Sequence, residues 1–186
     1  MAAYYLVSQL PSLDGVDEGV PLPITEERFL ELCDRLLGRK ARQALDGLTL
    51  CPSLYGEAGA SSALIGAWNE RERSLRVALA RARAEKSGRT FDSADVTPSA
   101  QIVALVDSAL AAESPLAAER ILDGDRLAFL ETLRPMDAFS EEFVLYYGLK
   151  LKILSRTRRF DKALGMAVYK SIYDAALGAD ENAEEG

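Results

Sequence analysis

The amino-acid sequence predicts an all-α protein, an irregular helical bundle of about six to eight helices with a short extended segment at the N-terminus. Two observations support this fold class. Apolar residues recur at helical spacing through most of the 186 residues, and the periodic segments begin at Ser or Thr and end at Gly or Pro. A composition of 48% hydrophobic and 27% charged residues is typical of a globular chain. We therefore expect a single helical domain over 1–178, with a candidate hinge at 87–97, and an acidic disordered tail at 179–186.

The boundaries of the first elements are predicted from residues that begin or end helices and loops. The apolar segment 4–10 is compatible with an extended strand or a buried N-terminal arm, and Pro11 ends it. A surface loop is expected up to Ile24 because this stretch is rich in Pro, Gly and Asp. Thr25 is the predicted N-cap of a helix that Gly38 closes, and a shorter helix is expected over 39–45. A second loop is predicted over 49–59.

The segment 64–86 predicts one long helix. Its apolar residues form a stripe beside a basic flank. The stripe contains Leu64, Trp68, Leu75, Leu79 and Ala82.

The C-terminal half contains four further predicted helices. Thr97 and Pro98 mark the start of one, and Ser114 with Pro115 marks the start of another that runs to about Arg134. In the second helix Asp123-Gly124 predicts a kink or a division into two shorter helices. Ser140 caps a helix with few polar positions, which is typical of a central, buried element. A last helix is expected over 160–177.

Composition and motifs argue against several classes of chemistry. The chain has no histidine, no phosphate-binding glycine motif and no CxxC spacing, so we expect no enzyme, no cofactor and no metal site. Cys33 and Cys51 are expected to be reduced thiols. A net charge of -7 argues against nucleic-acid binding, and the lack of a long apolar run predicts a cytoplasmic protein without a membrane span. The acidic pairs 26–27 and 141–142 are explained by their places in first helical turns.

Basic residues supply the candidate partner-binding site. Segment 70–86 carries six basic and three acidic residues, a balance of +3, and a second basic cluster lies at 150–162. The pairs Glu72 with Arg76 and Arg81 with Glu85 favour a solvated helix face. Arg73, Arg76 and Arg83 are expected on one side of the apolar stripe, where they would suit an acidic partner surface. Aromatic residues could anchor such a partner or, alternatively, belong to the core. The candidates are Arg71, Arg73, Arg76, Arg83, Trp68, Lys152, Arg156 and Arg159, and the other aromatic residues considered are Tyr4, Tyr5, Tyr146 and Tyr147.

Three stretches of sequence carry a resemblance to a known family. They are Tyr4-Tyr5-Leu6-Val7 with Leu10-Pro11-Ser12-Leu13, then Phe29-Leu30-Glu31-Leu32-Cys33, and then Trp68-Asn69-Glu70 with Leu75-Arg76 and Arg81-Ala82. With these the chain resembles a bacterial family encoded among the subunits of V/A-type ATPases, at the place of the C subunit, which is the counterpart of the eukaryotic d subunit. In the first half of the chain the resemblance consists of short sequence motifs. In the second half it consists only of helical character. The C subunit itself is longer, with three similar helical lobes.

The resemblance implies a non-catalytic role in ion transport. The protein would be a subunit or an assembly protein that contacts stalk or rotor subunits at the cytoplasmic face of the inner membrane. It predicts that charge reversal at Arg73 and Arg76 weakens the complex and leaves the fold intact.

Two alternatives stay open at this point. One is a free-standing helical adaptor or regulator that binds another protein or RNA. The other is an unfamiliar enzyme, which would require that buried carboxylates such as Glu57, Asp107 or Glu131 gather in one pocket.

Overall fold

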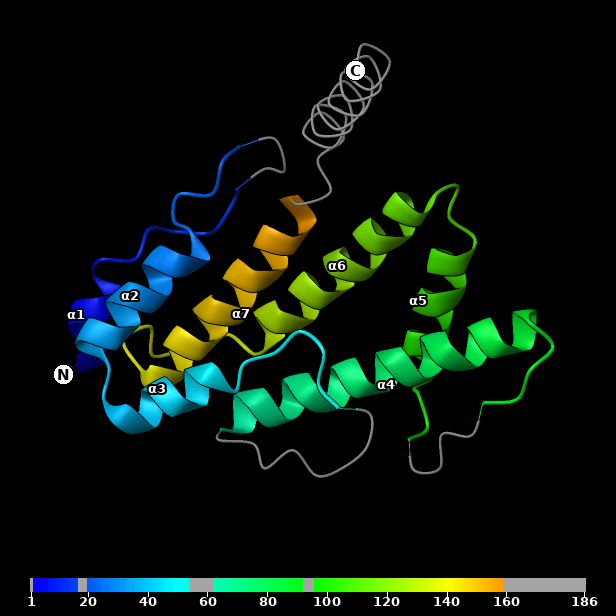
Figure 1. Ribbon diagram of the computed structural model, residues 1–186, viewed down its shortest axis with the longest axis horizontal. Helices are drawn as coiled ribbons and strands as arrows, with labels where there is room; N and C mark the ends of the chain where they lie inside the picture. The colour runs from blue at the N-terminus through cyan, green and yellow to red at the C-terminus, as the bar shows by residue number, and fades with distance from the viewer. Residues whose placement is uncertain (1, 17–19, 54–61, 92–95, 159–186) are drawn as a thin grey trace, which may run out of the picture.

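The computed structural model describes residues 2–16, 20–53, 62–91 and 96–158, and all regular structure in these ranges is helical (Figure 1). This confirms the all-α fold class and the predicted number of helices. The helices are α1 (Ala2–Val7), α2 (Glu26–Leu36), α3 (Arg39–Asp46), α4 (Ala63–Lys86), α5 (Ala100–Leu110), α6 (Pro115–Thr132) and α7 (Glu141–Arg158).

Most predicted caps are the observed ones. Thr25 Oγ1 accepts a hydrogen bond from the backbone N–H of Arg28 at the start of α2. Ser114 Oγ accepts one from Ala117 N, and Ser140 Oγ accepts one from Phe143 N. Each of these hydroxyls satisfies a backbone donor that has no partner inside its helix, which fixes where the helix begins.

Three local predictions are wrong. The N-terminal segment is short, but it forms a helix rather than an extended strand, since Leu6 and Ala3 are buried on one side of α1 while Tyr4 and Tyr5 are exposed. The helix expected at Thr97 begins after Ser99, whose Oγ accepts from Ile102 N. Gly124 does not divide its helix into two, because α6 continues from residue 115 to 132. The predicted last helix at 160–177, the acidic tail and part of the candidate hinge lie outside the described residues.

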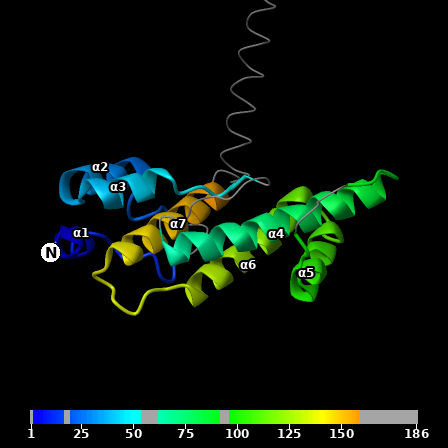
Figure 2. The ribbon, with the colours of Figure 1, turned by 90° about the horizontal axis from the view of Figure 1, so that it is seen from below.

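Helix α7 is the centre of the larger core. Its residues 144–151 are all buried, and it contacts α1, α2, α3, α4 and α6. Figure 2 shows α7 between the α2–α3 pair and the long helix α4. This confirms that the helix with the fewest polar positions is the buried one, because an element surrounded by neighbours has no solvated face to supply.

A smaller apolar cluster lies at the other end of the molecule. It joins the C-terminal half of α4 to α5 and α6 through Leu75, Leu79, Ile102, Val106 and Leu122. In Figure 1 α5 lies beside the far end of α4, away from α7. Helix α4, with 24 residues, therefore contributes to both clusters. No helix in the described part of the chain is long and apolar enough to cross a membrane.

Candidate functional site

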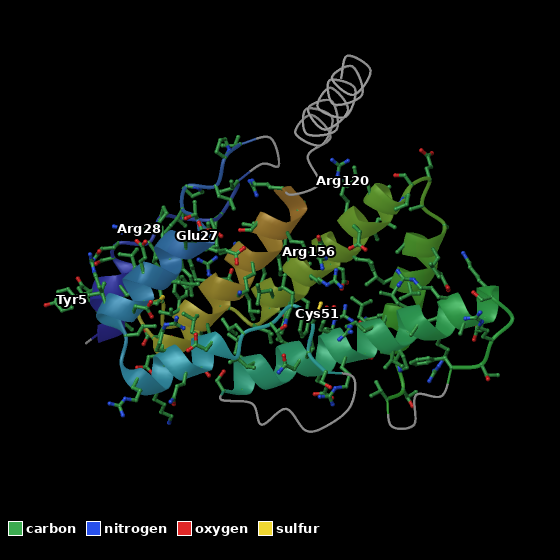
Figure 3. The ribbon with its side chains drawn as sticks, viewed as in Figure 1. Tyr5, Glu27, Arg28, Cys51, Arg120 and Arg156 are labelled. Carbon is green, nitrogen blue, oxygen red and sulfur yellow. The ribbon has the colours of Figure 1, made fainter. Side chains whose placement is uncertain are left out.

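The basic residues of α4 and α7 converge on the acidic residues of α6. Arg71 Nη2 of α4 lies 2.7 Å from Asp125 Oδ2. From the opposite side, Arg156 of α7 forms an ion pair with Asp123 and lies 3.4 Å from Glu119 (Figure 3). Charge complementarity of the kind that the sequence suggested for an external partner is therefore present within the chain.

The centre of this arrangement is a buried ion pair between α4 and α6. Arg126 donates two hydrogen bonds to the carboxylate of Glu72, at 2.9 and 2.7 Å, and a third to Asp123 Oδ1 at 2.9 Å. All three residues are buried, with Glu72 only 2% exposed. Burial lowers the pKa of Arg126. The hydrogen bonds and charges of Glu72 and Asp123 raise it by more than burial lowers it, so the net shift is upward. The guanidinium stays charged and holds the two helices together.

This network overturns the expected pairing along α4. Glu72 does not pair with Arg76 at i+4; it faces the interior and binds Arg126. Arg76 instead donates through Nη1 to the carbonyl of Pro52. Part of the face of α4 that was predicted to be solvated therefore lies inside the molecule. The partner of Glu72 comes from α6, and residue spacing along α4 cannot predict it.

The other sequence-predicted residues are scattered. Arg83 is exposed near the end of α4, Arg73 is half-buried, and Lys152 Nζ lies 3.7 Å from Glu26 Oε2. Arg159 lies outside the described residues. The role of these cations in binding a partner stays a prediction.

Trp68 is a core residue rather than a surface anchor. It is 1% exposed and its Nε1–H donates to the carbonyl of Thr49 at 3.1 Å. A side chain that binds a partner has to be reachable from solvent, so Trp68 stabilises the fold. Tyr146 and Tyr147 are buried as well.

A second charged cluster surrounds Lys150 near the middle of α7. Lys150 Nζ lies 2.5 Å from Asp14 Oδ1 and 2.6 Å from Glu131 Oε1, and Tyr146 donates its hydroxyl proton to the same Glu131 oxygen at 2.7 Å. Arg134 lies 3.3 Å from Asp14. These contacts attach the loop that follows α1 to α6 and α7, and the hydroxyl of Tyr147 donates a further hydrogen bond to Pro11 O at 2.9 Å.

The pKa values in the Lys150 cluster move so that every charge is kept. Burial lowers the pKa of Lys150, but hydrogen bonds to Asp14 and Glu131 outweigh it and the net shift is upward. The hydrogen bond from Lys150 lowers the pKa of Asp14. Burial, followed by the bond to Glu131, raises the pKa of Tyr146 to about 12. A group whose proton is held this firmly is suited to holding structure together, not to exchanging protons near neutral pH.

A cavity of about 190 Å³ opens beside this cluster. Its walls are mostly apolar, with Val7, Leu10 and Phe143 among them, and Asp14, Arg134 and Lys150 also line it. These two cations already have Asp14 as a carboxylate partner. The cavity is therefore suited to an apolar side chain rather than to a charged small molecule.

Sequence reasoning missed a group of exposed aromatic residues in the described part of the chain. Tyr4, Tyr5 and Phe139 are 53%, 60% and 48% exposed, and the ring of Tyr4 contacts the rings of the other two. Met136, in the loop between α6 and α7, is fully exposed. Tyr4 and Tyr5 were considered from their aromatic character, but only the tertiary fold brings Phe139 to them.

Of the three carboxylates considered for an unfamiliar enzyme, the two that the structure describes lie in different surroundings. Asp107 is exposed on α5, whereas Glu131 on α6 binds Lys150. Glu57 lies outside the described residues. Within the ranges that the structure describes, His, Cys, Asp and Glu side chains form no group of three that could hold a metal ion.

Comparison of the chain with protein-family models, with curated proteins and with solved structures finds no match.

Proposed function

We propose that this protein is a non-catalytic subunit or assembly protein of a bacterial V/A-type ATPase, similar to the C subunit of such complexes. In this role it would lie in the cytoplasm against the inner membrane and connect stalk and rotor subunits. It would take part in ion transport through protein contacts, without a cofactor. The sequence resemblance in segments 4–13, 29–33 and 68–82 is the source of this assignment.

The observation that best supports a mechanical role is the set of ion pairs that joins α4, α6 and α7. Glu72 of α4, Arg126 and Asp123 of α6 and Arg156 of α7 form a continuous chain of contacts. A component that transmits rotation has to resist sliding between its helices. Paired and hydrogen-bonded internal charges resist such sliding, because any displacement leaves a buried charge without its partner.

The test is a pull-down of the tagged protein from its native host in gentle detergent, with mass spectrometry of the proteins that accompany it. Recovery of stalk and ring subunits near stoichiometry is the expected result. Recovery of none would remove the ATPase assignment. Arg83→Glu is a suitable variant for the predicted basic face, since Arg83 is exposed and its replacement leaves the core unchanged.

A free-standing adaptor is the second candidate function. The observation that favours it is the group of exposed, mutually contacting aromatic rings, because such groups occur at protein-binding surfaces. In the same pull-down an adaptor would recover partners that belong to no ATPase. Binding to RNA through basic faces would show steep salt dependence, which distinguishes it from protein binding.

A further inference from the structure

We propose that Tyr4, Tyr5, Met136 and Phe139, here called the aromatic patch, form a docking surface for a basic amphipathic helix of a partner protein. The patch lies at the end of the molecule where α1 and the α6–α7 loop come together (Figure 2). Tyr5 projects from this end (Figure 3). The proposal does not depend on the ATPase assignment.

The first argument is the exposure of rings that already contact one another. The Tyr4 and Phe139 ring centroids are 4.8 Å apart, and those of Tyr4 and Tyr5 are 5.8 Å apart. About half of each residue remains accessible. Scattered exposed apolar residues are ordinary, but a contiguous group of large ones is typical of a binding surface. Tyrosine in particular combines a large apolar area with few rotatable bonds, so it loses little entropy on binding.

The second argument is that the structure holds the patch in place. The opposite side of α1 is anchored by Leu6, which has no exposed surface. The loop that carries Phe139 is closed by two hydrogen bonds, from Phe139 N to Asp137 Oδ1 at 2.9 Å and from Ser140 Oγ to the Asp137 carbonyl at 2.7 Å. A surface that is already ordered avoids part of the entropy cost of association.

The third argument is charge, and it selects the partner. Residues 2–13 contain no charged side chain. The neighbouring segment 134–142 contains Asp137, Glu141 and Glu142 against Arg134, a balance of -2, and Arg134 is already paired with Asp14. The three acidic residues are exposed, and Glu141 and Glu142 line a pocket together with Lys40 of α3. This acidic segment, here called the acidic rim, is adjacent in the chain to Phe139 and attracts Lys and Arg, which also bind the faces of aromatic rings, and it repels anionic membranes and nucleic acid.

The cavity beside Lys150 gives the partner an anchoring point. Val7 lies one helical turn after Tyr4, and Phe143 lies one turn into α7 from the loop that carries Phe139; both line this cavity. An apolar side chain of the docked helix fits there, because the cavity walls are mostly apolar. Aliphatic anchors at i and i+3 or i+4, with basic residues around them, describe the partner.

The experiment uses two synthetic probes, an amphipathic helix of about 14 residues made of Leu and Lys and its counterpart of Leu and Glu. Binding of each labelled peptide to the full chain is measured by fluorescence anisotropy. We expect the Leu/Lys peptide to bind, and Tyr5→Ser with Phe139→Ser to weaken its binding at least about tenfold. The matched control is Val103→Ser with Ile121→Ser, which changes two exposed apolar residues on α5 and α6 and leaves binding unchanged.

A charge variant tests the acidic rim separately. Glu142→Lys should weaken the Leu/Lys peptide several-fold and leave the circular dichroism of the protein unchanged, because Glu142 is exposed. Equal binding of the Leu/Glu peptide would overturn the proposal, and so would an equal loss in the control variant. Concentration-dependent self-association that the Tyr5/Phe139 variant abolishes would assign the patch to a second copy of this chain. Binding to vesicles of phosphatidylserine and phosphatidylcholine would assign it to membranes, and either result would refute the proposal.

Discussion

Glu72 of α4 and Arg126 of α6 are each other's main partners, and neither helix supplies this pairing by itself. Glu72 is 2% exposed and Arg126 is 7% exposed, yet in the sequence both are surrounded by polar residues typical of a solvated face. Each has its main partner 54 positions away. Charged residues are almost never fully buried unless they are paired. Glu72 can therefore be buried only because Arg126 lies opposite it, and the same holds in reverse.

The substitution Arg126→Met should be strongly destabilising. It leaves the Glu72 carboxylate buried without its bidentate partner, which costs about 3–5 kcal/mol for pairs of this kind. The free energy of unfolding in urea measures this effect. Arg28→Ala is the control, because Arg28 and Glu31 form an exposed pair at 2.9 Å whose loss costs less than about 1 kcal/mol.

The double variant Glu72→Leu with Arg126→Met should recover much of that loss. An apolar pair of similar volume no longer contains an unpaired charge, while Asp123 keeps its contact with Arg156. If the double variant is as unstable as the sum of the two single variants, the two side chains are not coupled and each stabilises the protein through other contacts, which would contradict the assigned pairing.

The Lys150 cluster predicts how stability changes with pH. The pKa of Asp14 is lowered from 3.8 by the hydrogen bond from Lys150. Burial raises the pKa of Glu131, but hydrogen bonds from Lys150 and Tyr146 lower it below 4.5 overall. The folded state therefore binds these protons less tightly than the unfolded chain, and the stabilisation is present above these values and is lost as the pH falls through them. The pKa of Lys150 is raised above 10.5, so its own contribution is lost only as the pH rises beyond that value.

We expect the difference in unfolding free energy between the wild type and Lys150→Met to be constant from about pH 5 to pH 10. Below about pH 4 the difference should shrink, because protonated Asp14 and Glu131 no longer need the ammonium group. Denaturant unfolding at several pH values checks this. A difference that grows towards low pH would contradict the assigned pairing.

At the scale of the elements, two helical glycines have opposite roles. Gly148 in α7 faces α2 and α3, and a Cβ at this position would lie 3.2 Å from Phe29 Cε1 and from Leu48 Cδ1 and 3.3 Å from Leu45 Cδ1. Gly124 in α6 is exposed, and a Cβ there would meet nothing within 4 Å. Gly148 is therefore what allows two helices to approach the central one, whereas Gly124 is only a weak point in helix propensity.

Substitution of alanine at these two positions should change the stability of the protein in opposite directions. Gly124→Ala should stabilise the protein by up to about 1 kcal/mol, because alanine loses less backbone entropy in a helix. Gly148→Ala should be destabilising, since three buried neighbours would have to move in a close-packed core. Thermal unfolding of both variants tests this, and stabilisation by Gly148→Ala would show that α2 and α3 can shift.

The start of α5 shows why one boundary was misplaced. Thr97 with Pro98 has the chemistry of a helix start, but so does Ser99, and the observed helix begins after Ser99. In a helix that begins after Ser99, Ile102, Val106 and Ala109 belong to the second apolar cluster. Several residues could cap this helix, and burial of its apolar face decides which of them does.

At the scale of the whole molecule, the two apolar clusters differ in size. The first contains most of the buried residues and surrounds α7, while α5 contributes only to the second. Elements with few buried contacts open at lower free energy than the global unfolding. The two ends of the molecule should therefore differ in local stability.

Native-state hydrogen exchange with mass spectrometry should show this difference. Amides of α7 are expected to exchange only on global unfolding, and those of α5 at a markedly lower free energy of opening. Val106→Ala should then speed exchange in α5 far more than in α7. Identical protection in both helices would show that the two clusters unfold as one unit.

The sequence by itself determined the helical class, the caps at Thr25, Ser114 and Ser140, the long helix α4 and the central position of α7. These features depend on the spacing of apolar residues and on local hydrogen bonds, which the residues of one segment establish among themselves. Only the tertiary structure decided that Trp68 is core, that Glu72 pairs with Arg126 and that Phe139 joins Tyr4 on the surface. These outcomes depend on partners far away in the chain, and the packing of helices determines which side chains meet.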